Sequence, residues 1–253
     1  MTVMYDTPQP NGILMSDPSR TGRRRSSGAQ PKYADRIQAG LALARKLRSH
    51  FQGRRNTAIL AISKAGLVVA NTVGQELNLP VGVFYVRQIR CPSQPRLSLG
   101  AMTSGELCSL NEDIVKGLHL PTEAIRQAAE ATYSSIEEDH TDLHPRHLRV
   151  LQQVLSPSVA HSTLDPVQHL ILIDDGIVAG DDIRSAVDAL RRARSDLKIT
   201  VATPIGVADT MKMIARRVEM TVTAFVPSAA YTVPSWYETG TALSPEETDQ
   251  LTH

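Results

Sequence analysis

The segment from Leu170 to Asp182 constrains the fold more than any other part of the chain. Four apolar residues, Leu170–Ile173, lead directly into Asp174 and Asp175, and glycines follow at positions 176 and 180. A short apolar run bounded by turn residues is typical of a strand that is buried on both faces. Glycines permit the tight turn after it, and the apolar spacing over 181–194 predicts a helix. A buried strand that turns into a helix indicates a parallel α/β sheet.

The same alternation of strands and helices continues along the chain. Apolar runs predict further strands at 58–62, 81–86, 199–204 and 221–226. Apolar residues at helical spacing predict helices at 33–50, 66–77, 121–138, 148–155 and 207–217. Residues 97–103 and 107–110 predict a β-hairpin that turns at Ser104–Gly105, and the Ser-Pro-Glu-Glu sequence at 244–247 predicts a capped helix over 244–251. We therefore expect a doubly wound, mostly parallel α/β sheet with a small hood or hairpin region.

Composition agrees with this fold class and excludes several functions. Aromatic residues make up only 4% of the chain, so the core must come from Ala, Val, Ile and Leu, which suit parallel strands covered on both faces. With 27 basic and 26 acidic residues, the net charge of +1 does not indicate a nucleic-acid-binding or membrane-binding protein. Cys91 and Cys108 form no metal or redox motif, and no apolar run is long enough for a membrane span. We expect a cytoplasmic protein.

Residues 1–31 differ in composition from the rest. Proline and glycine interrupt any regular pattern, and Arg23–Arg25 form a short basic run. The segment is predicted to be a disordered basic tail, which either is simply solvated or contacts an anionic partner such as nucleic acid. Residues 32–253 then form one domain with a C-terminal extension.

The loop that begins at Asp174 is the candidate site. In open parallel sheets, ligands bind beyond the carboxyl ends of the strands. A helix that starts there presents free N–H groups, which bind phosphate, and two carboxylates at the strand end suit ribose hydroxyls or Mg²⁺. The alternative, which the residues alone leave open, is an acidic turn followed by an ordinary helix cap.

The strand and its Asp-Asp-Gly-x-x-x-Gly sequence resemble the phosphoribosyl pyrophosphate motif of type I phosphoribosyltransferases, in particular of a bacterial group. The similarity extends from about Tyr33 to Leu251. Four further segments resemble, in order, the first strand with its pyrophosphate loop, the second strand with its basic exit, the flexible hairpin and the tail of that group: Ala58–Gly66, Phe84–Gln88, Pro95–Ala101 and Tyr231–Glu238.

The resemblance implies a role for each matching residue. Asp174 and Asp175 would hold the ribose hydroxyls, Lys64 would contact pyrophosphate, and Arg87 would lie near the leaving group. In an active enzyme, Mg²⁺ would bridge pyrophosphate and ribose. Asp174 and Asp175 would meet that ion through the substrate, and no residue is assigned as a direct ligand. The remaining substrate-binding positions are Ser63, Ala65 and Gly66 for pyrophosphate, and Gly176, Ile177, Val178, Ala179, Gly180, Asp181 and Asp182 for the 5-phosphate.

The phosphate loop departs from the family pattern. Ala179 and Asp182 stand where the family usually has hydroxyl residues, and Asp181 adds a second carboxylate. An ionised carboxylate cannot donate a hydrogen bond to phosphate, and like charges in close contact repel by about 1–4 kcal/mol. We expect Asp181 or Asp182 to satisfy the helix N-terminus directly, in place of a phosphate. In the pyrophosphate loop, Lys64 lacks the bidentate fork of arginine.

Two functions follow from these observations, and both remain open. One is a phosphoribosyltransferase that transfers ribose 5-phosphate from phosphoribosyl pyrophosphate to an unidentified acceptor. The other is a catalytically degenerate member that acts as a binding, regulatory or scaffold protein, which Ala179, Asp181 and Asp182 slightly favour. The partners expected are a small phosphorylated ligand, a protein partner or a second copy of the chain.

Overall fold

The computed structural model describes residues 2–4, 32–105, 107–141, 143–156, 166–228 and 232–252. Five parallel strands form its central sheet in the order β9-β8-β7-β2-β3. They are β2 (Thr57–Ala61), β3 (Val81–Val83), β7 (His169–Ile173), β8 (Lys198–Ile205) and β9 (Met220–Phe225). The predicted parallel sheet is confirmed, and the apolar run that leads into Asp174 forms β7.

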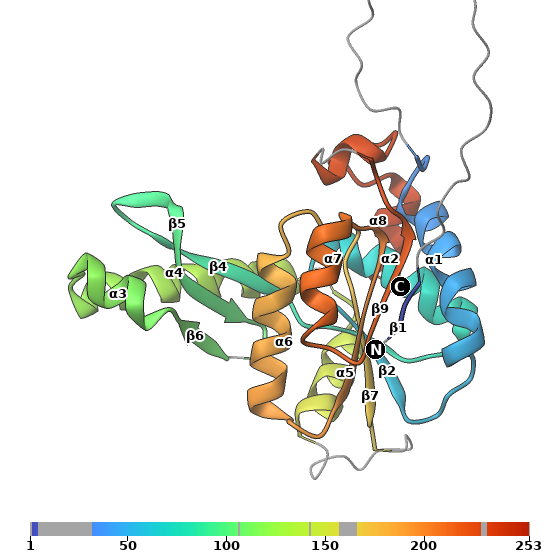
Figure 1. Ribbon diagram of the computed structural model, residues 1–253, viewed down its shortest axis with the longest axis horizontal. Helices are drawn as coiled ribbons and strands as arrows, with labels where there is room; N and C mark the ends of the chain where they lie inside the picture. Colours follow the sequence, from blue (N-terminus) through green and yellow to red (C-terminus); the bar gives the residue numbers. More distant parts are fainter. Residues whose placement is uncertain are drawn as a thin grey trace, which may run out of the picture.

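Helices cover both faces of this sheet, which confirms the doubly wound arrangement (Figure 1). Side chains alternate along β7, so that Leu170 and Leu172 pack toward one layer and Ile171 and Ile173 toward the other. The first layer consists of α5 (Pro145–Leu155), α6 (Asp181–Ala193) and α7 (Ala208–Ala215). The second consists of α1 (Arg36–Phe51) and α2 (Lys64–Leu77), with α8 (Pro245–Thr252) packed against α2.

A second, smaller unit projects from the sheet as an arm (Figure 1). It contains the antiparallel strands β4 (Val86–Cys91), β5 (Gln94–Thr103) and β6 (Cys108–Leu110), followed by α3 (Glu112–Leu118) and α4 (Thr122–His140). The predicted hairpin is the β5–β6 pair, but β4 adds a third strand and α3 was not predicted. The arm has its own small core around Ile89, Cys91 and Leu99.

The two ends of the chain add to the domain. β1 (Thr2–Met4) pairs in parallel with β9, so three residues of the expected tail join the sheet, because the open edge of β9 offers unpaired backbone groups. The remainder of that expected tail, residues 5–31, lies outside the described residues. Near the other end, the 3₁₀ helix η1 (Val233–Trp236) places Trp236 against Phe225, with ring centroids 5.4 Å apart. Within the described ranges no helix has the length and apolarity to cross a membrane.

Candidate functional site

The candidate site lies where the order of the strands reverses. β2 connects to β3 on one side, whereas β7 lies on the other side of β2 and continues to β8 and β9. A crevice for ligands forms at such a point, beyond the carboxyl ends of the adjacent strands. Ser63 follows β2 and Asp174 follows β7, and the Ser63 hydroxyl donates to Asp174 Oδ1 at 2.5 Å. The topology therefore brings two predicted site residues into contact across 111 positions of sequence.

Close packing of the two loops depends on Gly66. The Ser63 side chain caps α2 by accepting a hydrogen bond from the Gly66 N–H at 2.9 Å. A Cβ atom at position 66 would lie 3.0 Å from both Cα and Oδ1 of Asp174. Glycine thus allows the start of α2 to approach the end of β7. Ala65 lines the resulting cleft, while Lys64 is not among the lining residues.

The two adjacent aspartates have different surroundings. Asp174 Oδ1 accepts hydrogen bonds from Ser63 and from the backbone N–H of Asp175, at 3.0 Å in the second case. Asp175 is 9% exposed, and its Oδ2 accepts a hydrogen bond from Arg36 Nε at 2.9 Å. Burial, with the neighbouring Asp175 carboxylate, raises the pKa of Asp174 to about 8. Burial also raises the pKa of Asp175, although Arg36 acts in the opposite direction.

The loop after these aspartates leaves its backbone donors open. Gly180 is the N-cap of α6 and has a left-handed backbone, with φ of 79°, which glycine adopts without strain. No acceptor among the described residues is bonded to the backbone N–H groups from Val178 to Asp182. These five groups belong to the loop and the first turn at a helix start, where the helix dipole also favours an anion.

The expectation that Asp181 or Asp182 satisfies the start of α6 is wrong. The N-cap makes no side-chain hydrogen bond, because capping comes chiefly from the N-cap residue and here that residue is a glycine. Asp181 instead forms an ion pair with Arg184, one turn along the helix. Asp182 Oδ1 accepts a hydrogen bond from Gln88 Nε2 at 2.7 Å. Both carboxylates line the cleft without accepting hydrogen bonds from the N–H groups of residues 178–182.

A cleft of about 760 Å³ contains these features. Its inner wall is formed by Ser63, Ala65 and the continuous run 174–183. Its outer wall comes from the arm, and Val233 of η1 closes one end. All the predicted positions from Gly176 to Asp182 therefore line one cleft together with Asp174 and Asp175.

The arm contributes two cations, Arg90 and Arg96, for which the sequence predicts no role in the site. Alternate residues of β4 point to opposite faces, and Gln88 and Arg90 line the cleft, as does Arg96 of β5. Arg87, one position before Gln88, forms an ion pair with Asp139 of α4 and is not among the lining residues. The structure thus places the predicted Arg87 outside the cleft. The pairing register of β4 therefore decides which of its side chains face the cleft and which face α4.

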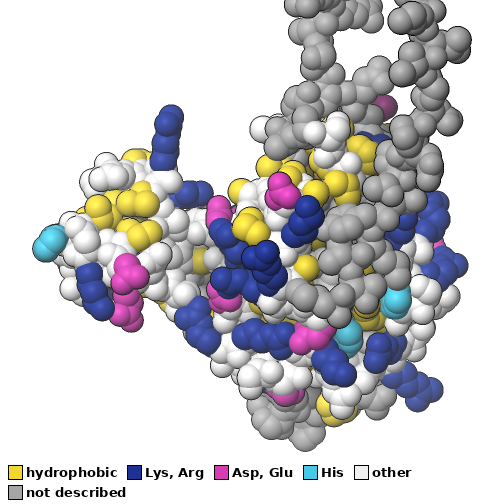
Figure 2. Space-filling view, viewed as in Figure 1, with side chains coloured by type: hydrophobic (Ala, Val, Ile, Leu, Met, Phe, Trp, Pro, Cys, Tyr) yellow, Lys and Arg dark blue, Asp and Glu magenta, His cyan; other side chains and the backbone are white. Residues whose placement is uncertain are grey.

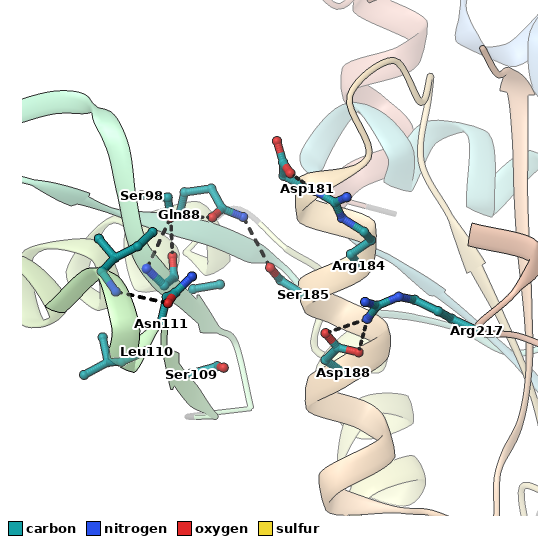
Figure 3. A pocket seen from close by; sticks show the side chains of 13 residues that line it. Gln88, Ser98, Ser109, Leu110, Asn111, Asp181, Arg184, Ser185, Asp188 and Arg217 are labelled. Atoms are coloured by element: carbon teal, nitrogen blue, oxygen red, sulfur yellow. Dashed lines mark hydrogen bonds and ion pairs between the residues drawn. The ribbon is translucent and has the colours of Figure 1, made fainter. Parts of the chain in front are cut away.

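Gln88 also connects the cleft to a neighbouring pocket of about 410 Å³, between the arm and α6 (Figure 3). The close-up shows Gln88 and Ser98 of the arm opposite Ser185 and Asp188 of α6. Gln88 Nε2 lies 3.4 Å from Ser185 Oγ, and its Oε1 accepts a hydrogen bond from Ser98 at 2.7 Å. Arg217 is bonded to Asp188 at 2.9 Å, so its charge is already compensated. This pocket is a polar contact zone between the two units.

Basic side chains gather on the face that carries α6 and α7, with acidic ones among them (Figure 2). Arg191 is paired with Glu219 at 2.8 Å and Arg217 with Asp188 at 2.9 Å. The local charges on this face are therefore largely balanced, as the net charge of +1 indicates for the whole chain.

The sheet order and the strand–loop–helix cleft define an α/β protein with a cleft at its topological switch point. No model of a protein family matches the sequence. Two curated proteins from two strains of Mycobacterium tuberculosis are each 26% identical over 215 residues, and both are named "Putative phosphoribosyl transferase". The match covers 85% of this chain but 45% of each relative, so the chain spans less than half the length of those proteins.

One solved structure supports the fold. The crystal structure of the protein TT1426 from Thermus thermophilus superposes with a TM-score of 0.62 at 21% identity, covering 87% of this chain and 98% of that chain. The chain is thus similar in sequence to proteins named as putative phosphoribosyl transferases, and its architecture agrees with the type I phosphoribosyltransferase-like fold that the sequence predicts.

Proposed function

We propose that the cleft binds phosphoribosyl pyrophosphate and that the protein transfers ribose 5-phosphate from it to an acceptor. The observation that carries this proposal is the row of N–H groups from Val178 to Asp182, which have no acceptor among the described residues and belong to residues that line the cleft beside Asp174. These groups would hold the 5-phosphate. Relatives named as phosphoribosyl transferases support the same conclusion.

The other parts of the ligand match the remaining walls of the cleft. Asp174, at the strand end, would accept a hydrogen bond from a ribose hydroxyl, since a carboxyl group can pair with such donors. Ser63 and the backbone near Ala65 would adjoin the pyrophosphate. Arg90 and Arg96, both exposed on the arm, would compensate the charge of the leaving pyrophosphate. In such a reaction the protein contributes mainly orientation and charge stabilisation.

The residues present fit a magnesium ion that arrives with the substrate. Mg²⁺ usually binds through one or two carboxylates together with substrate phosphates and water. Asp175 is already bonded to Arg36, and the described residues contain no cluster of three or more His, Cys, Asp or Glu side chains that could hold a metal. When bound, Mg²⁺ would neutralise pyrophosphate, and Asp174 would meet the ion through the substrate.

Calorimetric titration with phosphoribosyl pyrophosphate and Mg²⁺ tests the proposal. We expect micromolar binding, and we expect Asp174→Asn to weaken it, because the amide changes the hydrogen bonding to ribose. Glu246→Gln, an exposed acid of α8 outside the cleft, is the matched control. Absence of binding at millimolar ligand would contradict the proposal.

The degenerate alternative retains one specific observation in its favour. Ala179 offers no hydroxyl donor, and Asp181 and Asp182 place two carboxylates at the mouth of the phosphate loop. A phosphate near them would experience repulsion that their partners, Arg184 and Gln88, only partly offset. Release of pyrophosphate in the presence of a panel of nucleobases and amines separates the two functions. Binding without release from any of them would favour the binding protein.

A further inference from the structure

A buried charged network lies directly behind the cleft and is centred on Arg36. This arginine is the first residue of α1 and is only 2% exposed. Its Nε donates to Asp175 Oδ2 at 2.9 Å, and its backbone N–H donates to Glu247 Oε1 at 2.7 Å. A guanidinium buried this deeply must have its donors satisfied, since an unpaired buried charge is strongly destabilising.

The C-terminal segment, residues 237–247, supplies those partners. The guanidinium donates to the carbonyl of Gly240 at 3.1 Å, and it lies 4.5 Å from the centre of the Tyr237 ring. Further acceptors at 3.4–3.5 Å are Thr239 Oγ1 and the carbonyl oxygen of Ala242. The Tyr237 hydroxyl donates to the backbone carbonyl of Asp175 at 2.5 Å. Asp175 is therefore held both by its side chain and by its backbone.

We propose that Arg36 is a positioning residue for the cleft: with residues 237–247 as its support, it fixes Asp175 for ligand binding without touching the ligand. This inference rests on the proposed function. Asp175 lines the cleft, and only one of its carboxylate oxygens is bonded to Arg36. Arg36 thus determines the orientation of the second oxygen and, with Tyr237, the backbone that leads from Asp174 into the phosphate loop.

The planar guanidinium is what makes this arrangement specific. Its donors point in fixed directions, so that one side chain can hold Asp175, Gly240 and Thr239 at once. Lysine would retain the charge as a single point and could not reproduce this set of contacts. An uncharged residue would leave the buried Asp175 and Glu247 with no cation between them.

The first test compares Arg36→Met and Arg36→Lys with Arg48→Met. Arg48 is in the same helix and is bonded to Glu76 at 2.7 Å, but both of these side chains are exposed, so its replacement controls for the loss of an ion pair. Binding of phosphoribosyl pyrophosphate with Mg²⁺ is measured by calorimetry at a temperature where circular dichroism shows each variant to be folded. We expect Arg36→Met to weaken binding about 10- to 100-fold, Arg36→Lys to recover part of that loss, and Arg48→Met to match the wild type.

A milder pair of variants applies if Arg36→Met does not fold. Tyr237→Phe removes only the hydroxyl that holds the Asp175 carbonyl and leaves the ring over Arg36. Tyr33→Phe removes a hydroxyl from the neighbouring ring, 6.1 Å away, and is the control. We expect Tyr237→Phe to weaken binding about 3- to 10-fold and Tyr33→Phe to leave it unchanged.

The outcomes separate this inference from the proposed function. Wild-type affinity in folded Arg36→Met or Tyr237→Phe would overturn the positioning role while leaving the function intact. Absence of binding by the wild type itself would overturn both. Equal weakening by Arg36→Met and Arg48→Met would also overturn the inference, because a general loss of charge on α1 would then account for it.

Discussion

The two ends of the segment 174–182 hold their polar groups in opposite ways. At the strand end, Asp174 and Asp175 are bonded to Ser63 and Arg36. At the helix start, Asp181 and Asp182 are exposed, their side chains turn to Arg184 and Gln88, and the backbone N–H groups have no acceptor among the described residues. One end is closed by the protein itself, and the other is open to a ligand.

This difference explains how the fold accommodates the unusual residues at the start of α6. The strand end is part of the buried structure, so its contacts contribute directly to the free energy of unfolding. The helix start makes few internal contacts, and residues such as Ala179 and Asp182 can replace hydroxyl residues there without disturbing the sheet. Substitutions should therefore change mainly stability at one end and mainly ligand affinity at the other.

Replacement of Glu247 should give the largest effect, a loss of stability in the network behind the strand end. This residue is completely buried, accepts hydrogen bonds from the backbone N–H groups of Arg36 and Ser244, and forms a capping box with Ser244. Glu247→Ala removes a partner of a buried charge and should lower the free energy of unfolding by about 3–5 kcal/mol. Urea unfolding measures this loss.

Glu246→Ala is the control for that measurement. Glu246 precedes Glu247 in the first turn of α8 but is exposed, so its replacement should cost no more than about 0.5 kcal/mol. Similar losses for the two variants would mean that the network behind the cleft does not stabilise the fold.

Asp174 should make the stability of the folded protein depend on pH. Its pKa is raised to about 8 in the folded protein, against about 3.9 in an unfolded chain. The folded state therefore binds the proton more tightly, and the stability from this group is lost as the pH rises toward 8. One proton gives a limiting slope of about 1.4 kcal/mol per pH unit. Position 174 cannot titrate in Asp174→Asn, so the variant should lack the contribution of this residue to the slope.

In the range from pH 6.5 to 8, the effect comes from the buried pair Asp174 and Asp175, and the comparison with Asp174→Asn shows the part that Asp174 contributes. Burial lowers the pKa of His147 and of His169 to about 4, so these residues reduce stability only as the pH falls below about 6.5. Thermal unfolding across the range should show a falling melting temperature for the wild type and a flatter one for Asp174→Asn. Parallel curves for the two proteins would show that Asp174 does not carry the proton.

At the open end, restoring hydroxyl donors should improve phosphate binding. The double variant Ala179→Thr, Asp182→Thr adds two donors and removes a carboxylate. We expect inorganic phosphate to bind about 10-fold more tightly, since a hydrogen bond to a charged group contributes about 1.5–3 kcal/mol. NMR titration of the backbone amides of 178–182 measures the affinity. Asp209→Thr, an exposed acid on α7, controls for the change in net charge. Unchanged affinity in the double variant would indicate that the phosphate does not bind at this loop.

Local signals were sufficient to predict most of the fold and the inner wall of the cleft. The apolar run before Asp174 and the glycine at 180 define β7 and the start of α6 without reference to other residues. Arg36 could not be found in this way, because its partners Asp175 and Glu247 lie 139 and 211 positions along the chain. A single arginine at the start of a predicted helix carries no pattern that indicates burial.

The strands at the base of the arm also could not be predicted from local sequence. The sequence predicts one strand over 81–86, but β3 ends at Val83 and β4 begins at Val86, in a different sheet. Which side chains of β4 face the cleft depends on its pairing with β5, where Arg87 lies opposite Met102 and Gln88 opposite Ala101. A shift of one residue exchanges the two faces, and local propensity does not determine that register.

The smallest expected effect is on ligand affinity, and it tests which face of β4 contacts a ligand in the cleft. Arg90 and Arg96 line the cleft, whereas Arg87 is paired with Asp139 on α4. Because the two cleft arginines are exposed, solvent screening limits each charge to a modest contribution. Arg90→Met and Arg96→Met should each weaken binding of phosphoribosyl pyrophosphate about 3-fold at low salt, and less at high salt. Arg87→Met removes the same charge from the opposite face of β4 and should leave the affinity unchanged. If Arg87→Met weakened binding more than Arg90→Met did, the ligand would contact the face of β4 that carries Arg87.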